Sequence, residues 1–298
     1  MLASIRQLVL VTASIVLCIF LTWFLLLQYG ESKVLQEPMK HPFLTELSNR
    51  GPLIICHAGD SDFPDNTLEG FAAALEKNPN AILWADVRPA ADGTLMLFRE
   101  TDFALTTDGH GWVDYTDPHD IAKLNAGYFF KDSKGQLKFR DHPIHIPTLV
   151  EFLRRFPKQL LVLNFLNNRP GLDEKIMSVI DQEKSSARIL IQSPEEGLLR
   201  DLRQEKPDWL FGASRARNTQ LKMLASVGLA SLATFGGDLY VSEYQIGQNI
   251  MFNEQISSEL QRRKLPFIIG PIQDKSLAQS LLRSGARGII TKNVQLLN

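Results

Sequence analysis

The sequence predicts an α/β protein, a (β/α)8 TIM barrel preceded by one N-terminal transmembrane helix. An uncharged apolar stretch occupies the N-terminal region, and strand-like and helix-like runs alternate from about Gly51 to the C-terminus. The chain has 298 residues, of which 44% are hydrophobic, enough to bury a full core. The residues that follow the apolar stretch are enough for such a barrel, which usually has about 250 residues. We therefore expect one large domain.

The apolar stretch runs from Leu8 to Leu27 without a charged residue. At about 1.5 Å per residue it can cross a hydrocarbon core of about 30 Å. A cleaved signal peptide is the competing interpretation, but its apolar region is usually only about 7 to 15 residues long. Arg6 precedes the stretch, which favours a cytoplasmic N-terminus. The predicted order is a short cytoplasmic N-terminus (1–7), a transmembrane helix (8–27), a tether (28–50) and a barrel on the extracytoplasmic side (51–298).

Eight short runs in the barrel region are apolar and are bounded by turn residues, as buried strands are. Amphipathic runs with helix-start signals lie between them, such as Thr148 followed three residues later by Glu151, the pattern of a capping box. Alternating strands and helices in this number predict a closed parallel barrel. The expected strands are Leu53–His57, Ile82–Arg88, Gln159–Leu166, Arg188–Ser193, Trp209–Ser214, Ala230–Phe235, Phe267–Ile272 and Gly288–Thr291.

One further apolar run, Thr94 to Phe98, follows the second strand after a short turn through Asp92 and Gly93. A parallel crossover needs about a dozen residues or more, so this run is expected to fold back antiparallel on the second strand. The resulting hairpin places Arg99 and Glu100 above the carboxyl end of that strand.

Charge and cysteine content exclude two classes of protein. The chain carries 32 basic and 33 acidic residues, and this formal net charge of −1 gives no electrostatic case for binding nucleic acid. Two cysteines, Cys18 in the apolar stretch and Cys56, are too few for a disulfide framework. A membrane, reached through the N-terminal helix, is the expected partner.

The most informative segment begins at Cys56-His57-Ala58-Gly59 and continues to Pro64-Asp65-Asn66-Thr67-Leu68-Glu69. Asn66, with Glu69 three residues later, is expected to cap the helix that follows. His57 then ends a strand that enters a βα unit, where α/β folds bind their ligands. A histidine there can act on a phosphate, although a structural histidine bonded to the backbone is the alternative for this position alone.

From Leu53 onward the chain resembles the glycerophosphodiester phosphodiesterase family, whose members typically open with His-Arg-Gly and Pro-Glu-Asn-Thr-Leu-Glu segments. The resemblance implies a phosphoric diester hydrolase of lipid metabolism in which two histidines exchange protons. It also implies a divalent cation, calcium or magnesium, held by a Glu-x-Asp pair on the second strand and a Glu on the third. Further matching segments are Thr106-Thr107-Asp108-Gly109, Leu124-Asn125-Ala126-Gly127, Leu190-Ile191-Gln192-Ser193 and Gly288-Ile289-Ile290-Thr291.

Against that family pattern, the chain keeps His57 as the expected catalytic histidine and Asp86 as the remaining metal ligand. The Glu of the pair falls on Trp84, the third-strand Glu on Asn164 and the second histidine on Arg99. With one carboxylate left, we expect calcium or magnesium binding to be weak or absent. Arg99 cannot exchange protons near neutral pH, but its guanidinium can bind the phosphate of a substrate.

Two hypotheses about function follow. The favoured one is a membrane-anchored barrel with a degraded catalytic site, a pseudoenzyme that binds a phosphodiester or related ligand without metal-dependent turnover. The alternative is an active phosphodiesterase that hydrolyses glycerophosphodiesters or related phospholipid derivatives. Its rebuilt site would use His57, Arg99 and Asp86, with Glu100, Asp60 or Asp62 supplying the lost carboxylates.

Individual residues also have purely structural interpretations. Arg99 can form a surface salt bridge with a neighbouring carboxylate, and Asp86 can serve as a hydrogen-bond acceptor for a loop. A further hypothesis is a carbohydrate- or peptide-binding barrel with Trp84, Trp112 and Tyr128 as stacking surfaces. Aromatic residues at such spacings more often cover a core.

Overall fold

The computed structural model describes residues 2–32, 39–132 and 134–297, and its core is a TIM-like arrangement of parallel strands, consistent with the predicted fold class. A parallel bridge between Gly212 and Leu239 links the two ends of the strand series. In spatial order the parallel strands are β6 (Leu210–Phe211), β5 (Ile189–Gln192), β4 (Leu161–Phe165), β2 (Ile82–Pro89), β1 (Leu53–His57), β11 (Gly288–Thr291), β10 (Phe267–Gly270) and β7 (Tyr240–Glu243).

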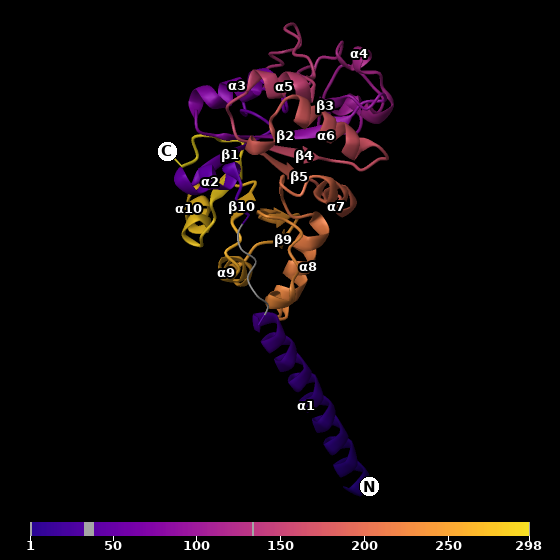
Figure 1. Cartoon of the computed structure of the whole chain (residues 1–298), viewed down its shortest axis with the longest axis vertical. Coiled ribbons are helices and arrows are strands. Elements are labelled where there is room, and N and C mark those ends of the chain that lie inside the picture. The colour runs from indigo at the N-terminus through magenta and orange to yellow at the C-terminus, as the bar shows by residue number, and fades with distance from the viewer. Residues whose placement is uncertain (1, 33–38, 133, 298) are drawn as a thin grey trace.

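Helices connect the strands and pack around them (Figure 1). The capping box predicted from Thr148 and Glu151 is confirmed: the Glu151 N–H donates to Thr148 Oγ1, and the Thr148 N–H donates to the Glu151 carboxylate. The helices are α1 (Leu2–Ser32), α2 (Pro42–Asn49), α3 (Leu68–Lys77), α4 (Pro118–Ile121), α5 (Leu149–Arg155), α6 (Leu172–Gln182), α7 (Glu196–Glu205), α8 (Arg215–Ser226), α9 (Glu254–Arg262) and α10 (Lys275–Arg283). The 3-10 helices are η1 (Phe103–Leu105), η2 (Val113–Tyr115), η3 (Ser186–Arg188) and η4 (Ala230–Leu232).

Strand β3 (Leu95–Leu97) pairs antiparallel with β2, with Val87 opposite Leu97 and Pro89 opposite Leu95. The chain then makes a long excursion through η1, η2 and α4 before it returns at α5. This excursion has its own apolar cluster, which includes Phe98 and Phe103. It therefore holds the segment just after β3 in a fixed place beside β2.

The strand predicted at Ala230–Phe235 is wrong. That segment contains the 3-10 helix η4, and the strand at this place in the barrel is β7. Ala230–Phe235 is mostly apolar, whereas β7 reads Tyr-Val-Ser-Glu, so a search for apolar runs favoured the wrong segment. Tyr240 and Val241 of β7 are aromatic and β-branched residues that suit a pleated, buried surface, whereas the Ala-Ser-Leu of η4 does not.

The predicted tether is also wrong in part, because Pro42–Asn49 forms α2 and packs into the barrel domain. The His41 side chain caps the helix, and the proline lies in its first turn. Phe43 and Leu47 are each 1% exposed and share an apolar cluster with Leu53. Since Leu53 begins β1, α2 covers the amino end of the barrel.

Helix α1 is longer than the predicted span 8–27 and projects away from the barrel (Figure 1). Within Ile5–Glu31, an 18-residue apolar window has a mean hydropathy of 2.6, and none of its residues is buried. Its length and composition suffice to cross a membrane, and a signal sequence has the same properties. The Trp23 indole N–H donates to the Val227 carbonyl at 3.1 Å, so α1 contacts the segment after α8. Residues 33–38 of the predicted tether lie outside the described residues.

Candidate functional site

The predicted site residues meet at the carboxyl ends of three adjacent strands. His57 is the last residue of β1, Trp84 and Asp86 lie on β2, and Asn164 lies on β4. The strand register places His57 beside Trp84, and Asp86 beside Asn164. Arg99 follows β3 and reaches the same place. All except Asp86 line a cavity of about 270 Å³, here called the central cavity.

Asp86 is fully buried, and four side chains donate hydrogen bonds to its carboxylate. Asn164 Nδ2 and Trp84 Nε1 donate to Oδ1 at 2.8 and 3.2 Å. Arg99 Nη1 and Asn66 Nδ2 donate to Oδ2 at 3.0 and 3.5 Å. The ion pair with Arg99 supplies the positive charge that a buried carboxylate needs.

Asn66 was expected as a helix cap, and this expectation is wrong. Thr67 caps α3 instead, by accepting a hydrogen bond from the Gly70 N–H. Asn66 has a φ of 60°, a left-handed conformation that asparagine tolerates better than most residues. Its side chain turns toward β2, where Oδ1 accepts a hydrogen bond from the Asp86 N–H at 2.9 Å. Asn66 is therefore a site residue that the capping pattern concealed.

Arg99 also lies against His57, with Nη1 3.1 Å from Nε2. Because arginine has only donors, His57 Nε2 must accept, which assigns the proton of the neutral ring to Nδ1. Burial lowers the pKa of His57, and the Arg99 cation lowers it further against the attraction of Asp86. His57 is thus a neutral imidazole near pH 7. The Trp84 ring, 5.7 Å away between centroids, packs beside it.

The carboxylate of Asp86 stays ionised despite its burial. Burial alone would raise its pKa, but His57 when protonated, the Arg99 cation, and hydrogen bonds from Asn164 and Trp84 outweigh that effect. The pKa of Asp86 is consequently held below its usual value. The carboxylate and Arg99 form an internal ion pair at the floor of the site.

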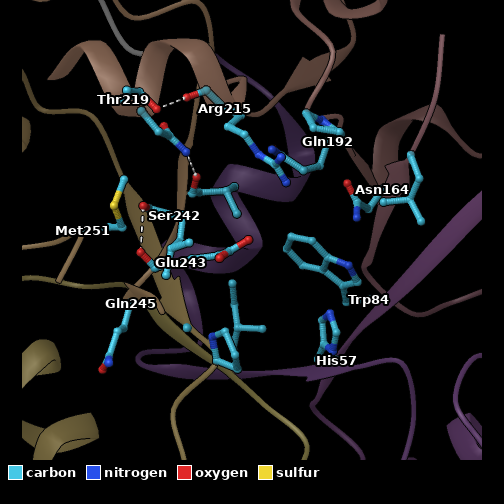
Figure 2. A pocket seen from close by; sticks show the side chains of 18 of the residues that line it. His57, Trp84, Asn164, Gln192, Arg215, Thr219, Ser242, Glu243, Gln245 and Met251 are labelled. Atoms are coloured by element: carbon cyan, nitrogen blue, oxygen red, sulfur yellow. Dashed lines mark hydrogen bonds between the residues drawn. The ribbon is translucent and has the colours of Figure 1, made fainter. Parts of the chain in front are cut away.

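The wall of the central cavity opposite His57 and Trp84 carries charged residues that were not predicted from the sequence (Figure 2). Arg215, the first residue of α8, and Glu243, the last residue of β7, both point into the cavity in Figure 2. Their positions at the carboxyl ends of β6 and β7 were the signal that could have found them. Glu243 was not identified because the strand was predicted at Ala230–Phe235 and not at Tyr240–Glu243.

The residues around Asp86 do not suit a calcium or magnesium ion. Such ions take about six or more oxygen ligands. The Trp84 side chain has no oxygen, and Asn164 directs its amide nitrogen toward Asp86. The Arg99 guanidinium already lies 3.0 Å from that carboxylate. In the described part of the chain, no group of three His, Cys, Asp or Glu side chains could hold a metal ion.

The carboxylates considered as replacements lie elsewhere. Asp60 and Asp62 both bind Lys77, at 2.8 and 3.0 Å. Glu100 follows Arg99 and lines a neighbouring cavity. The aromatic residues also have separate surroundings: Trp84 donates to Asp86, whereas Trp112 is 59% exposed and packs against Tyr115. Tyr128 lies under the Arg140 guanidinium.

Comparison with known proteins finds similar sequences. A sequence model of the Glycerophosphoryl diester phosphodiesterase family matches residues 57–296. A glycerophosphodiester phosphodiesterase of Caldanaerobacter subterraneus subsp. tengcongensis is 30% identical over 166 residues. The matched region is 54% of this chain and 65% of that protein, so the match spans less than two thirds of that relative.

Solved structures share the fold. The glycerophosphoryl diester phosphodiesterase domain of the uncharacterized protein Rv2277c from Mycobacterium tuberculosis has a TM-score of 0.70 at 17% identity, covering 81% of this chain and 96% of that one. An Oleispira antarctica phosphodiesterase, solved in complex with the product sn-glycerol-3-phosphate, has a TM-score of 0.65 at 21% identity and covers 84% and 97%. At these identities the likeness concerns the fold.

Proposed function

Because the chain belongs to the Glycerophosphoryl diester phosphodiesterase family, we propose that it is a membrane-anchored barrel that binds a phosphodiester or related ligand without metal-dependent turnover. Family membership supports a phosphodiester as the class of ligand. The observation that carries the loss of metal-dependent chemistry is the state of Asp86, whose carboxylate already accepts four hydrogen bonds. A divalent cation would have to displace these donors and approach the Arg99 cation.

Arg99 is the proposed phosphate-binding residue. Its side chain is 45% exposed although it pairs with a buried carboxylate. Among the described contacts, Asp86 and His57 both engage Nη1, so the rest of the guanidinium is available for a ligand. A guanidinium can bind two phosphate oxygens at once. Arg215 on the opposite wall of the central cavity provides a second cation for an anionic ligand.

The test is an assay of the full-length protein in nanodiscs with glycerophosphocholine and glycerophosphoethanolamine. We expect hydrolysis at least ~10²-fold below that of a family member with both histidines and all three carboxylates, because a general acid or base contributes about that factor or more. Calcium and EDTA should leave the rate unchanged. Robust turnover that EDTA abolishes would contradict the proposal.

A second measurement tests binding itself. Calorimetry with sn-glycerol-3-phosphate should show binding that Arg99→Gln weakens by about tenfold or more, as expected for a lost charge-assisted hydrogen bond. Arg154→Gln is the matched control, because Arg154 is an exposed arginine paired with Glu183. Equal affinities for the two variants would exclude Arg99 as the phosphate-binding residue.

An active phosphodiesterase with a rebuilt site is the second candidate, and the state of His57 favours it. A neutral imidazole can accept a proton from an attacking water at Nε2, once the Arg99 guanidinium turns from that nitrogen to the substrate phosphate. In this case hydrolysis would be slow, insensitive to EDTA and lost in His57→Gln. Turnover that persists in His57→Gln would exclude this role.

We also propose that α1 spans a membrane, with the N-terminus cytoplasmic and the barrel on the opposite side. The supporting observation is the exposed apolar window within Ile5–Glu31. The full chain should sediment with membranes, and removal of residues 1–33 should release the barrel. Protease added to sealed cells or vesicles would show on which side of the membrane the barrel lies. An intact chain recovered from the soluble fraction with its N-terminus beyond Gln28 would establish cleavage instead.

A further inference from the structure

The carboxyl end of α1 packs against the barrel domain at the end of α8 and at η4. Gly30 is buried there, and a Cβ at this position would overlap the Ser231 side chain. The Trp23 indole donates to the Val227 carbonyl at 3.1 Å. Arg262, the last residue of α9, donates to the backbone carbonyl of the residue after Gly30 at 3.5 Å. These contacts fix the direction in which α1 leaves the barrel (Figure 1).

The segment that receives α1 is uncharged and partly exposed. From Met223 to Gly237 the chain has no charged residue. Met223 and Val227 are 66% and 56% exposed, and between them the Ser226 hydroxyl donates to the Met223 carbonyl. Single exposed apolar side chains are common on protein surfaces, so exposure alone identifies no partner. We call the segment 223–232 the α8–η4 corner.

The position of Trp23 along α1 gives the depth of the α8–η4 corner. Trp23 lies four residues before the end of the apolar stretch 8–27, which is about 6 Å along a helix. Because helical side chains lean toward the helix N-terminus, the Val227 carbonyl that the indole binds lies at this level or deeper. If α1 spans a bilayer, this level is the outer edge of the hydrocarbon core, where tryptophan is enriched.

The backbone of the α8–η4 corner suits a place with little water. The N–H groups of Val227 and Leu229 both donate to the Leu224 carbonyl, and the Gly228 N–H donates to the Ala225 carbonyl. The Val227 carbonyl accepts from the indole of α1. Backbone groups paired in this way avoid the cost of unsatisfied donors and acceptors in lipid.

We propose that the α8–η4 corner is a membrane-contact surface, at which the Met223 and Val227 side chains enter the boundary between lipid headgroups and acyl chains beside α1. This inference rests on the proposed membrane span of α1. It adds that the barrel keeps one side, the end of α8 with η4, against the bilayer. Apolar side chains at this level leave water, whereas a charged surface would resist transfer.

The experiment measures lipid contact with a fluorophore on single cysteines. Met223→Cys and Val227→Cys are made in a Cys18→Ala background and labelled with NBD, and the buried Cys56 is protected from the label. The full chain is reconstituted in phosphatidylcholine nanodiscs with or without lipids that carry a nitroxide quencher near the headgroup. Both labels should lose much of their emission to the nitroxide lipids, whereas iodide in the buffer should quench them weakly.

Tyr115→Cys, made and labelled in the same way, is the matched control. Tyr115 is 77% exposed and lies shortly before α4, which Figure 1 shows at the end of the domain away from α1. Its label should respond in the opposite way, with strong quenching by iodide and little by the nitroxide lipids.

Cys18 tests the premise separately, because it lies within the apolar stretch of α1. Its label in the otherwise unchanged chain should be quenched by lipids with a nitroxide in the acyl chain. If it is not, the span of α1 fails, and the inference that rests on it fails too. If Cys18 is quenched but the labels at 223 and 227 behave like that at 115, the span stands and the membrane-contact surface is overturned. Labels at 223 and 227 that neither quencher reaches would show coverage by protein, such as a second copy of the chain, and would also overturn it.

Discussion

Replacing Asp86 with asparagine tests whether this carboxylate is a structural ion-pair partner or a ligand awaiting a metal. The substitution keeps the shape of the side chain but places an amide nitrogen where one carboxylate oxygen accepts hydrogen bonds. If that nitrogen takes the place of Oδ2, Arg99 and Asn66 lose their acceptor. Breaking a buried ion pair costs about 3–5 kcal/mol. Because the Arg99 side chain is 45% exposed and can regain water, we expect the lower end, about 3 kcal/mol.

The assay is thermal unfolding of the full chain in nanodiscs, with and without EDTA. For a domain of this size, about 3 kcal/mol corresponds to a fall in Tm of roughly 6–12 °C. Asp65→Asn is the matched control, since Asp65 pairs with Lys292 in an exposed salt bridge and should lose less than about 1 kcal/mol. EDTA should leave the Tm of both variants unchanged. If Asp86→Asn unfolds no earlier than Asp65→Asn, the structural role assigned to this ion pair is wrong.

Three further predictions concern the site and its support. Joint replacement by Trp84→Glu, Arg99→His and Asn164→Glu should restore calcium-dependent hydrolysis in a phosphodiesterase assay, whereas the single changes should do little, because such residues act as a unit. His57 has a lowered pKa when folded, so below about pH 6.5 the unfolded chain binds more protons. The Tm of the wild type should therefore fall more steeply with decreasing pH than that of His57→Gln, and parallel curves would contradict this. Phe43→Ala should cost about 3–5 kcal/mol in thermal unfolding because α2 is part of the core, whereas a loose tether would show no change.

Much of the strand framework could be predicted, because buried parallel strands are continuous apolar runs and their order along the chain fixes where their ends meet. His57, Asp86 and Asn164 could be placed together from that logic alone. Their contact with Arg99 needed the additional deduction that Thr94 to Phe98 turns back on the second strand. The pairing of β3 with β2 has this antiparallel direction. The chemical roles of these residues stay predictions.

The rest could not be predicted because local patterns compete with tertiary ones. Asn66 fits a helix cap by sequence, but the buried Asp86 N–H and carboxylate attract its side chain more effectively than a free helix end does. Ala230–Phe235 is apolar like a strand, yet β7 forms ten residues later along the chain. That shift also concealed Glu243, since a residue at a strand end is recognised only when the strand is placed correctly.

Asp86 accepts hydrogen bonds from Trp84, Arg99 and Asn164, the three positions that differ from the pattern expected for the family. We therefore expect single reversions to fail. Asp86 is fully buried, and a carboxylate there needs a nearby positive charge and donors for both oxygens. Arg99 supplies the charge, and Trp84 and Asn164 supply donors. Arg99→His alone would remove the permanent cation, and Trp84→Glu alone would place a second carboxylate beside Asp86, which raises the pKa of one of them. The Arg99 guanidinium thus supplies the positive charge that a metal ion would supply in a metal-binding site. The Asp86 carboxylate cannot pair with Arg99 and bind a metal ion at the same time.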